Sequence, residues 1–285
     1  MRSVEFNADQ FVGGIEALNT GLPRNGQLDA GEAIWLEANF AAYLAGGGRG
    51  DLVPPDPHWD NDRGAALITA YDQTHKDGRL ENLRGQLKRL MANRCPSCGG
   101  ARPGELDHHL PKSEYQEFSL FPANLVACCG SCNRTKRADV GGVAEEAFLH
   151  PYFDAVPAIP YVHVTLHVGH RHVRATLAFD ENAAIADDQV KARMRHQFDR
   201  IDVNLQLESE VEELIGEVSA EFRKADPPPS RDTVRLALSE MADRKADYFG
   251  GGCWQAAVFR AMAASDQYCD GGYRMTEETV LDPVV

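Results

Sequence analysis

The sequence predicts an α+β fold that is mainly helical, with a small β-containing core in the middle of the chain. Apolar residues recur at helical spacing in long stretches before residue 95 and after residue 187. Short apolar or alternating runs within residues 104–129 and 161–179 have the pattern of β-hairpins. Five of the seven cysteines lie within residues 95–132, which indicates a metal site in the core.

The length of 285 residues and the hydrophobic content of 43% suit one large domain or two to three smaller ones. The chain has no run of about 20 apolar residues, so we expect no membrane span. Its first residues, MRSVEFNADQF, lack the apolar core of a signal peptide. We therefore expect a cytoplasmic protein whose cysteines are reduced rather than paired in disulfides.

The N-terminal region is predicted to be helical. Residues 29–46 have apolar side chains at helical spacing, and Asp29 is a candidate N-cap. Residues 46–62 are rich in Gly, Pro and Asp and form a predicted loop. Two further helices are predicted over residues 62–78 and 79–94, the second running directly into Cys95.

The C-terminal region is predicted to be mainly helical after one β-hairpin. Alternation over 161–168 and 172–179 predicts the two strands of that hairpin. Residues 187–225 form a charged amphipathic helical stretch with a predicted break near Asp202–Asn204. Residues 251–273 have the pattern of a buried helix that ends in a Gly-rich turn.

Charge separates the middle of the chain from both flanks. The net charge is −14, yet residues 84–137 hold nine Lys/Arg and four Asp/Glu, a net charge of +5. A cationic segment inside an acidic protein can bind phosphate locally. We therefore divide the chain into an N-terminal helical region (1–83), a core (84–140), and a mainly helical C-terminal region (141–285) with a hairpin near 160–180.

Two cysteine pairs in this core have the spacing C-x2-C-x30-C-x2-C. Each pair fits a tight turn that aims two thiolates at one point, and four thiolates satisfy a tetrahedral Zn²⁺ without leaving an open position. The pattern predicts a structural zinc site that stabilises the fold. Cys128 lies outside the spacing and is predicted to be a buried strand residue. The predicted zinc ligands are Cys95, Cys98, Cys129 and Cys132.

The segment between the cysteine pairs carries further metal-capable residues. The chain reads DHHLP at residues 107–111 and NLVACCGSCNRTK at 124–136. This order resembles the HNH family of nucleases, the ββα-metal or His-Me finger group, with its pattern D-H-x-x-P followed by N-L-x-x-x-C-x-x-C-N-x-x-K. The resemblance covers about residues 84–140 and has Asn in the third motif position, where His also occurs in the family. It implies a central ββα-metal nuclease core.

Hydrolysis of a phosphodiester needs an activated water and stabilisation of the charge on the phosphate. An imidazole titrates near neutral pH, so His108 is the candidate general base. Asp107 and Asn133 offer oxygen ligands for a catalytic Mg²⁺ or Mn²⁺. The resemblance gives Asn124 the role of orienting the loop behind the base. It leaves His109 as a variable position, although some family members place two His together, which would make His108 the metal ligand and His109 the base.

Four basic residues are candidate phosphate contacts, and for each the alternative is a solvated side chain. The leading hypothesis is a metal-dependent DNA endonuclease. An RNase with the same site and a non-catalytic zinc adaptor of a larger complex stay open as alternatives. The arrangement of a central core with helical flanks also resembles effector nucleases of bacterial anti-phage defence, which implies a protein partner such as an ATPase. The four candidate phosphate contacts are Lys112, Arg134, Lys136 and Arg137.

Overall fold

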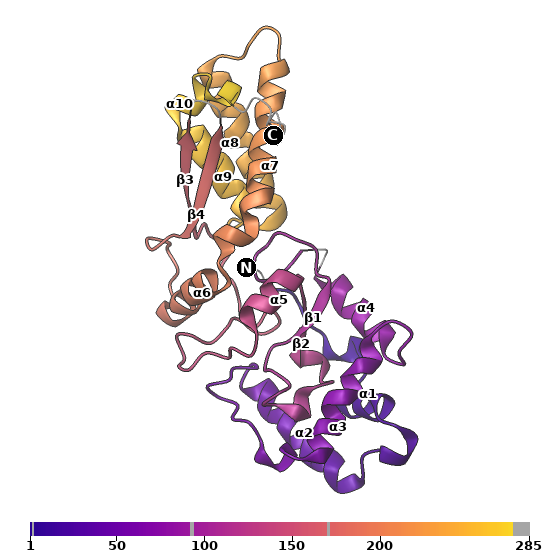
Figure 1. The fold of residues 1–285 in the computed structure, drawn as a ribbon. Coiled ribbons are helices and arrows are strands. Elements are labelled where there is room, and N and C mark those ends of the chain that lie inside the picture. The colour runs from indigo at the N-terminus through magenta and orange to yellow at the C-terminus, as the bar shows by residue number, and fades with distance from the viewer. Residues whose placement is uncertain (2, 92–93, 170–171, 276–285) are drawn as a thin grey trace, which may run out of the picture. The chain divides into compact units, whose positions relative to one another are not determined.

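The computed structural model describes residues 1, 3–91, 94–169 and 172–275 (Figure 1). Within these residues the fold is mainly helical with two small antiparallel sheets, so the predicted α+β class is confirmed. The chain divides into two compact units. Unit 1 comprises residues 1–156 and 186–201, and unit 2 comprises residues 157–185 together with the chain from residue 202 onward. Residues 1–83 and 84–140, predicted as separate regions, thus belong to the same unit.

Unit 1 contains a two-stranded sheet surrounded by helices. The predicted hairpin in the core exists, although each strand has only four residues. The elements are α1 (Gly14–Gly21), α2 (Ala30–Ala45), α3 (Asp62–Ala70), α4 (Glu81–Leu90), β1 (Glu105–His108), β2 (Leu125–Cys128), α5 (Gly130–Lys136) and α6 (Asp188–Ile201), with short 3-10 turns at Ala8–Gln10, Arg24–Gly26, Pro57–Trp59, Tyr71–Thr74, Gln116–Phe118 and Pro122–Asn124.

Helix α2 begins where the sequence predicts. The Asp29 carboxylate accepts a hydrogen bond from the backbone N–H of Glu32, and the Glu32 carboxylate accepts one from the N–H of Asp29. This reciprocal capping satisfies donors that the first helical turn leaves free. The helix then buries Leu36, Phe40 and Tyr43 on one face.

The core of unit 1 joins this N-terminal helix to the loop between β1 and β2. The Phe40 ring stacks on Phe121 with centroids 4.3 Å apart, and Tyr43 meets Phe118 edge-on at 4.9 Å. Buried aromatic pairs of this kind contribute packing beyond their apolar area. The loop that follows the candidate base is therefore held by residues that lie far away in sequence.

The described residues of unit 2 form a hairpin and four helices: β3 (Val162–Val168), β4 (Val173–Phe179), α7 (Val203–Lys224), α8 (Arg231–Phe249), α9 (Trp254–Ala264) and α10 (Asp266–Cys269), with a 3-10 turn at Gly272–Met275. The strands pair in the predicted antiparallel way, and residues 170 and 171 at their connection lie outside the described residues. Exposed His163 and His167 share one face of β3. The predicted helix break falls at Asp202, whose φ of 53° lies in the left-handed region. Throughout the described chain, every helix is too short or too polar to cross a lipid bilayer.

Candidate functional site

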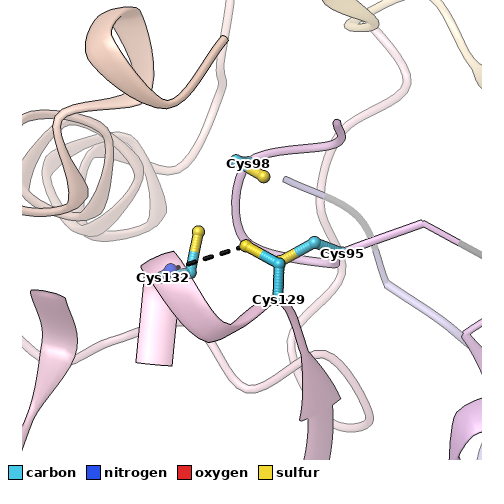
Figure 2. A group of neighbouring side chains, drawn as sticks. All are labelled: Cys95, Cys98, Cys129 and Cys132. Atoms are coloured by element: carbon cyan, nitrogen blue, oxygen red, sulfur yellow. Dashed lines mark hydrogen bonds between the residues drawn. The ribbon is translucent and has the colours of Figure 1, made fainter. Parts of the chain in front are cut away.

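The four predicted zinc ligands converge on one point beside the strand pair (Figure 2). Cys95 and Cys98 lie on the turn before β1, while Cys129 is the N-cap residue of α5 and Cys132 lies in its first turn. Their four Sγ atoms all lie within 4.8 Å of one another. The turn closes because the N–H of Gly99 donates to the carbonyl of Cys95 at 2.9 Å, with a φ of 73° at Gly99 that favours glycine.

This group fits a tetrahedral metal ion such as zinc. All four side chains are buried, and a thiolate is the ligand that Zn²⁺ prefers in structural sites. Hydrogen bonds from the neighbouring thiols, that of Cys129 foremost, hold the pKa of Cys95 well below its usual range. The predicted convergence of the cysteines is confirmed. Cys128 is buried in β2 and does not belong to the group.

A cavity of about 520 Å³ lies beside β1, and we call it the site cavity. Its wall contains the candidate base His108 and both candidate metal ligands, Asp107 and Asn133. The predicted contacts Lys112 and Arg137 also line it. The fold thus brings together residues from β1, from the loop after it, and from α5. Of the predicted catalytic residues and phosphate contacts, Asn124, Arg134 and Lys136 do not line this cavity.

Strand β1 places these groups by its alternating side chains. Glu105 and Asp107 are more exposed than Leu106 and His108, as expected for successive residues on opposite faces. Both Asp107 and His108 nevertheless line the site cavity. His108 is the last residue of the strand, so its ring lies where the ladder ends.

The hydrogen bonds of His108 define which ring nitrogen is available for chemistry. Its Nε2 lies 3.0 Å from the carbonyl oxygen of Ser119. A carbonyl only accepts, so Nε2 carries the proton in the neutral ring and Nδ1 keeps its lone pair. Burial lowers the pKa of His108 to about 3, so the ring is neutral at pH 7. A neutral imidazole whose Nδ1 has no hydrogen-bond partner among the described residues can accept a proton from water.

Lys136 lies close to Asp107 rather than at the surface. Its Nζ is 3.0 Å from Oδ2 of Asp107 and donates to the backbone carbonyl of His108 at 3.1 Å. Both side chains are almost fully buried, with exposed fractions of 7% and 12%. Burial raises the pKa of Asp107, and the nearby ammonium offsets part of that rise. The phosphate contact of Lys136 stays a prediction. Its ammonium already has two partners within the fold.

Asn133 is held by a carboxylate that the sequence analysis did not single out. Its Nδ2 donates to Oε2 of Glu105 at 2.7 Å. Because a carboxylate can only accept, the amide nitrogen faces Glu105 and the amide oxygen of Asn133 remains for another partner. Glu105 lies two residues before Asp107 on the same face of β1, and it also lines the site cavity. This two-residue spacing was the sequence signal that could have identified it.

Asn124 holds the loop that follows the candidate base. Its Oδ1 accepts from the backbone N–H of Leu110 at 2.8 Å, and its Nδ2 donates to the carbonyls of Leu110 at 2.9 Å and Phe118 at 3.3 Å. The backbone of His109 donates to the carbonyl of Asn124 at 2.8 Å. These contacts fix the residues immediately after His108, which is the position predicted for an orienting residue.

A chain of buried hydrogen bonds continues from Asn124 away from the site. The Tyr43 hydroxyl donates to Oδ1 of Asn124 at 3.0 Å and lies 3.0 Å from Nε2 of His150. Nδ1 of His150 accepts from the N–H of Tyr152, so Nε2 of His150 carries the proton and donates to Tyr43. The ring of His109 packs against His150 with centroids 4.2 Å apart. Tyr43 and His150 were missed because only the fold brings them to Asn124.

Basic and aromatic side chains from residues 71–84 complete the site cavity. Tyr71 lies 4.4 Å from the His108 ring, centroid to centroid, and Nζ of Lys112 lies 4.4 Å from the Tyr71 centroid. Arg84 donates to the Tyr71 hydroxyl at 3.2 Å. Arg84 and His75 also line the cavity. The helical pattern of this region gave no signal that these residues face the site.

The comparisons with known proteins add one partial similarity. No family model matches the chain, and no solved structure matches it. The chain is 41% identical over 63 residues to protein Ea31 of Escherichia phage lambda. That alignment covers 21% of this chain and 21% of the phage protein, so the similarity spans about a fifth of each.

Proposed function

We propose that the chain is a metal-dependent endonuclease of the HNH type that hydrolyses phosphodiester bonds of DNA. The observation that carries this proposal is the meeting of Asp107, His108 and Asn133 on the wall of one cavity, beside four clustered cysteines. A zinc-binding adaptor would need the cysteines but has no use for a neutral imidazole next to oxygen ligands.

His108 acts in this proposal as the general base. Its Nδ1 takes a proton from the attacking water while Nε2 stays bonded to the Ser119 carbonyl, which keeps the ring in place. After proton transfer the ring is cationic, and the buried environment disfavours that state. The same burial makes the neutral ring a weaker base than a solvated imidazole, so proton transfer would need a divalent ion that acidifies the attacking water.

The residues facing the cavity fit a hard divalent cation. Asp107 offers a carboxylate oxygen, and Asn133 offers its amide oxygen because its amide nitrogen is bonded to Glu105. A Mg²⁺ or Mn²⁺ ion bound there would neutralise the charge that develops on the leaving 3′-oxygen. Lys136 already bonds one oxygen of Asp107, so the ion and the ammonium would share or exchange that carboxylate.

Cations around the cavity would hold the phosphate backbone. Lys112 and Arg137 line the wall, and Arg84 lies beside them. Guanidinium and ammonium groups supply most of the affinity of proteins for nucleic acids, and they act on phosphates without reading sequence. Contacts of this kind do not choose between deoxyribose and ribose, so DNA and RNA must be compared directly.

The test is incubation of the zinc-loaded protein with plasmid DNA, single-stranded DNA and total RNA in Mg²⁺ or Mn²⁺. We expect DNA products that depend on the divalent ion and disappear when it is chelated under conditions that leave zinc bound. Adding the ion back should restore cleavage. Products from RNA alone would identify an RNase. Absence of product from all three substrates would contradict the proposal and favour the adaptor.

A further inference from the structure

A second hollow of about 460 Å³ lies on unit 1, and three arginines line it. It is formed by the side of α5 and by the end of α6, two helices that pack together in unit 1 (Figure 1). We call it the arginine hollow, defined by Ser131, Arg134, Thr135, Arg137 and Arg200. All of its lining side chains are hydrogen-bond donors or cations, and none is a carboxylate.

Arg137 belongs to both the arginine hollow and the site cavity. It is exposed, and among the described residues its guanidinium has no hydrogen-bond or ion-pair partner. The two hollows therefore share a wall that carries a free positive charge. A ligand that runs from one hollow to the other would pass this guanidinium.

The backbone of Arg137 adopts a conformation that its side chain does not favour. As the C-cap of α5 it has φ 54° and ψ −134°, a region that glycine occupies and that residues with a Cβ avoid. Arginine at this position thus opposes folding locally, and among the described residues no hydrogen bond or ion pair of its side chain offsets this. Unfavourable backbone conformations of this kind cluster at sites that bind or react.

Arg200 is oriented by the fold before any ligand arrives. Its Nε donates to Oδ2 of Asp139 at 2.7 Å, and its Nη1 donates to the carbonyl of Thr135 at 3.0 Å. Nη2 remains available, and the side chain is 38% exposed. A guanidinium held in this way loses little side-chain entropy on binding, which favours a bidentate or charge-assisted contact with an oxyanion.

We propose that the arginine hollow binds a backbone phosphate of a nucleic-acid strand, beyond the phosphate that is cleaved in the site cavity. This inference rests on the proposed function, because the shared wall at Arg137 makes the two hollows consecutive positions along one strand. Arg200 lies far outside the motif segment, so it extends the nucleic-acid contact surface onto α6. The contact acts on phosphate and therefore gives affinity rather than sequence preference.

The test measures binding of a short fluorescein-labelled DNA duplex, and of the matching single-stranded DNA and RNA, by fluorescence anisotropy. The parent for this test is His108→Ala, which lacks the proposed base, so the probes stay intact. In this background, Arg137→Gly combined with Arg200→Ala should raise the dissociation constant roughly tenfold at moderate salt. On the duplex probe, the slope of log affinity against log salt should fall by about 0.9 for each phosphate that the variant no longer neutralises, and by about 0.7 on single strands.

Arg137→Gly alone separates binding from folding. Glycine suits the observed backbone, so this variant should melt at the same temperature as the parent or higher, yet bind less tightly. Arg200→Lys keeps the positive charge but not the planar guanidinium with its paired donors. It should recover only part of the affinity that Arg200→Ala removes. The matched control is Arg24→Ala, an exposed arginine in the same unit, which should bind as the parent does.

The outcomes are distinguishable from failure of the proposed function. Affinity and salt slope unchanged in Arg137→Gly and in the double variant would overturn the inference, even if the wild-type protein cleaves DNA. Failure of the parent to bind any probe would overturn it as well. If binding depends on these arginines but the wild-type protein does not cleave, the phosphate contact is upheld and the proposed nuclease activity is refuted.

Discussion

The carboxyl group of Glu117 is buried without full compensation. The residue is 0% exposed, and neither oxygen accepts a well-formed hydrogen bond from the described residues. Burial raises its pKa to about 7, although the nearby backbone amides of Glu117 and Asp56 offset part of the rise. The Asp56 carboxylate adds to the rise through like-charge repulsion. Inside the fold the carboxyl is therefore mostly protonated below about pH 7.

Replacing Glu117 by Gln tests this at the scale of a single residue. A pKa raised above the ordinary value of 4.5 gives stability that is complete below pH 4.5 and is lost as pH rises through about 7. From pH 5 to pH 8 the wild type should therefore lose roughly 3 kcal/mol of unfolding free energy relative to Glu117→Gln. Urea unfolding at several pH values measures this, with exposed Glu145→Gln as the control. Parallel curves for Glu117→Gln and wild type would contradict the assignment.

Lys136 serves as the cation that the buried Asp107 requires when no other ion is bound. Lys136→Met removes the charge and keeps most of the volume, so Asp107 loses its partner and the fold should lose roughly 3 kcal/mol. In the proposal a divalent ion takes the same carboxylate. Added Mg²⁺ or Mn²⁺ should then raise the melting temperature of Lys136→Met more than that of the wild type or of exposed Lys76→Met. Equal shifts in all three proteins would show that the ammonium and the ion do not compete.

We expect the β1–β2–α5 element to depend on metal binding by the four clustered thiols, because its two strands have only four residues each. Cys95→Ser should lose zinc, and with it a metal-binding free energy on the order of 10 kcal/mol that is coupled to folding. We expect poor soluble yield and a loss of the cooperative transition of unit 1. Cys253→Ser, outside the cluster, should keep one zinc per chain by elemental analysis. Full zinc content and unchanged melting of Cys95→Ser would disprove the structural role.

Helix α2 supports the candidate site through the hydroxyl of Tyr43. Tyr43→Phe removes the hydroxyl partner of Nε2 of His150 and one of the two donors to Oδ1 of Asn124. Loss of this buried hydrogen bond should cost about 1–3 kcal/mol of stability. If this network of hydrogen bonds positions His108, the kcat for DNA cleavage should fall while KM stays close to the wild-type value. Exposed Tyr248→Phe is the control. Unchanged kcat in a destabilised Tyr43→Phe would leave the network a purely structural role.

At the scale of the whole molecule, local patterns predicted elements well. The helix capped by Asp29, both hairpins, the break at Asp202 and the convergence of four cysteines all follow from spacing and residue type within short windows. Each depends on interactions between residues close in sequence, or on a metal-ligand spacing that permits few alternatives.

Long-range contacts could not be predicted in the same way. The pairing of Lys136 with Asp107 requires the end of α5 to pack over β1, and the bond from Asn133 to Glu105 depends on the same packing. The connection of Tyr43 to Asn124 spans 81 positions in the sequence. The grouping of residues 186–201 with unit 1, which brings Arg200 to the site region, likewise has no local signature. Sequence spacing identified the chemical groups, and the fold determined their partners.

The most direct test of the proposed chemistry is the cleavage rate of His108→Ala. It is measured with the divalent ion and the substrate that give the wild type its highest rate. Loss of a general base lowers a rate by about 10²–10⁴-fold, and we expect at least the lower figure with zinc content unchanged. Because the buried ring also bonds the Ser119 carbonyl, the melting temperature should fall while unfolding stays cooperative. His163→Ala, which replaces an exposed histidine of β3, should cleave as the wild type does. Wild-type cleavage by a pure, zinc-loaded preparation of His108→Ala would contradict the proposal.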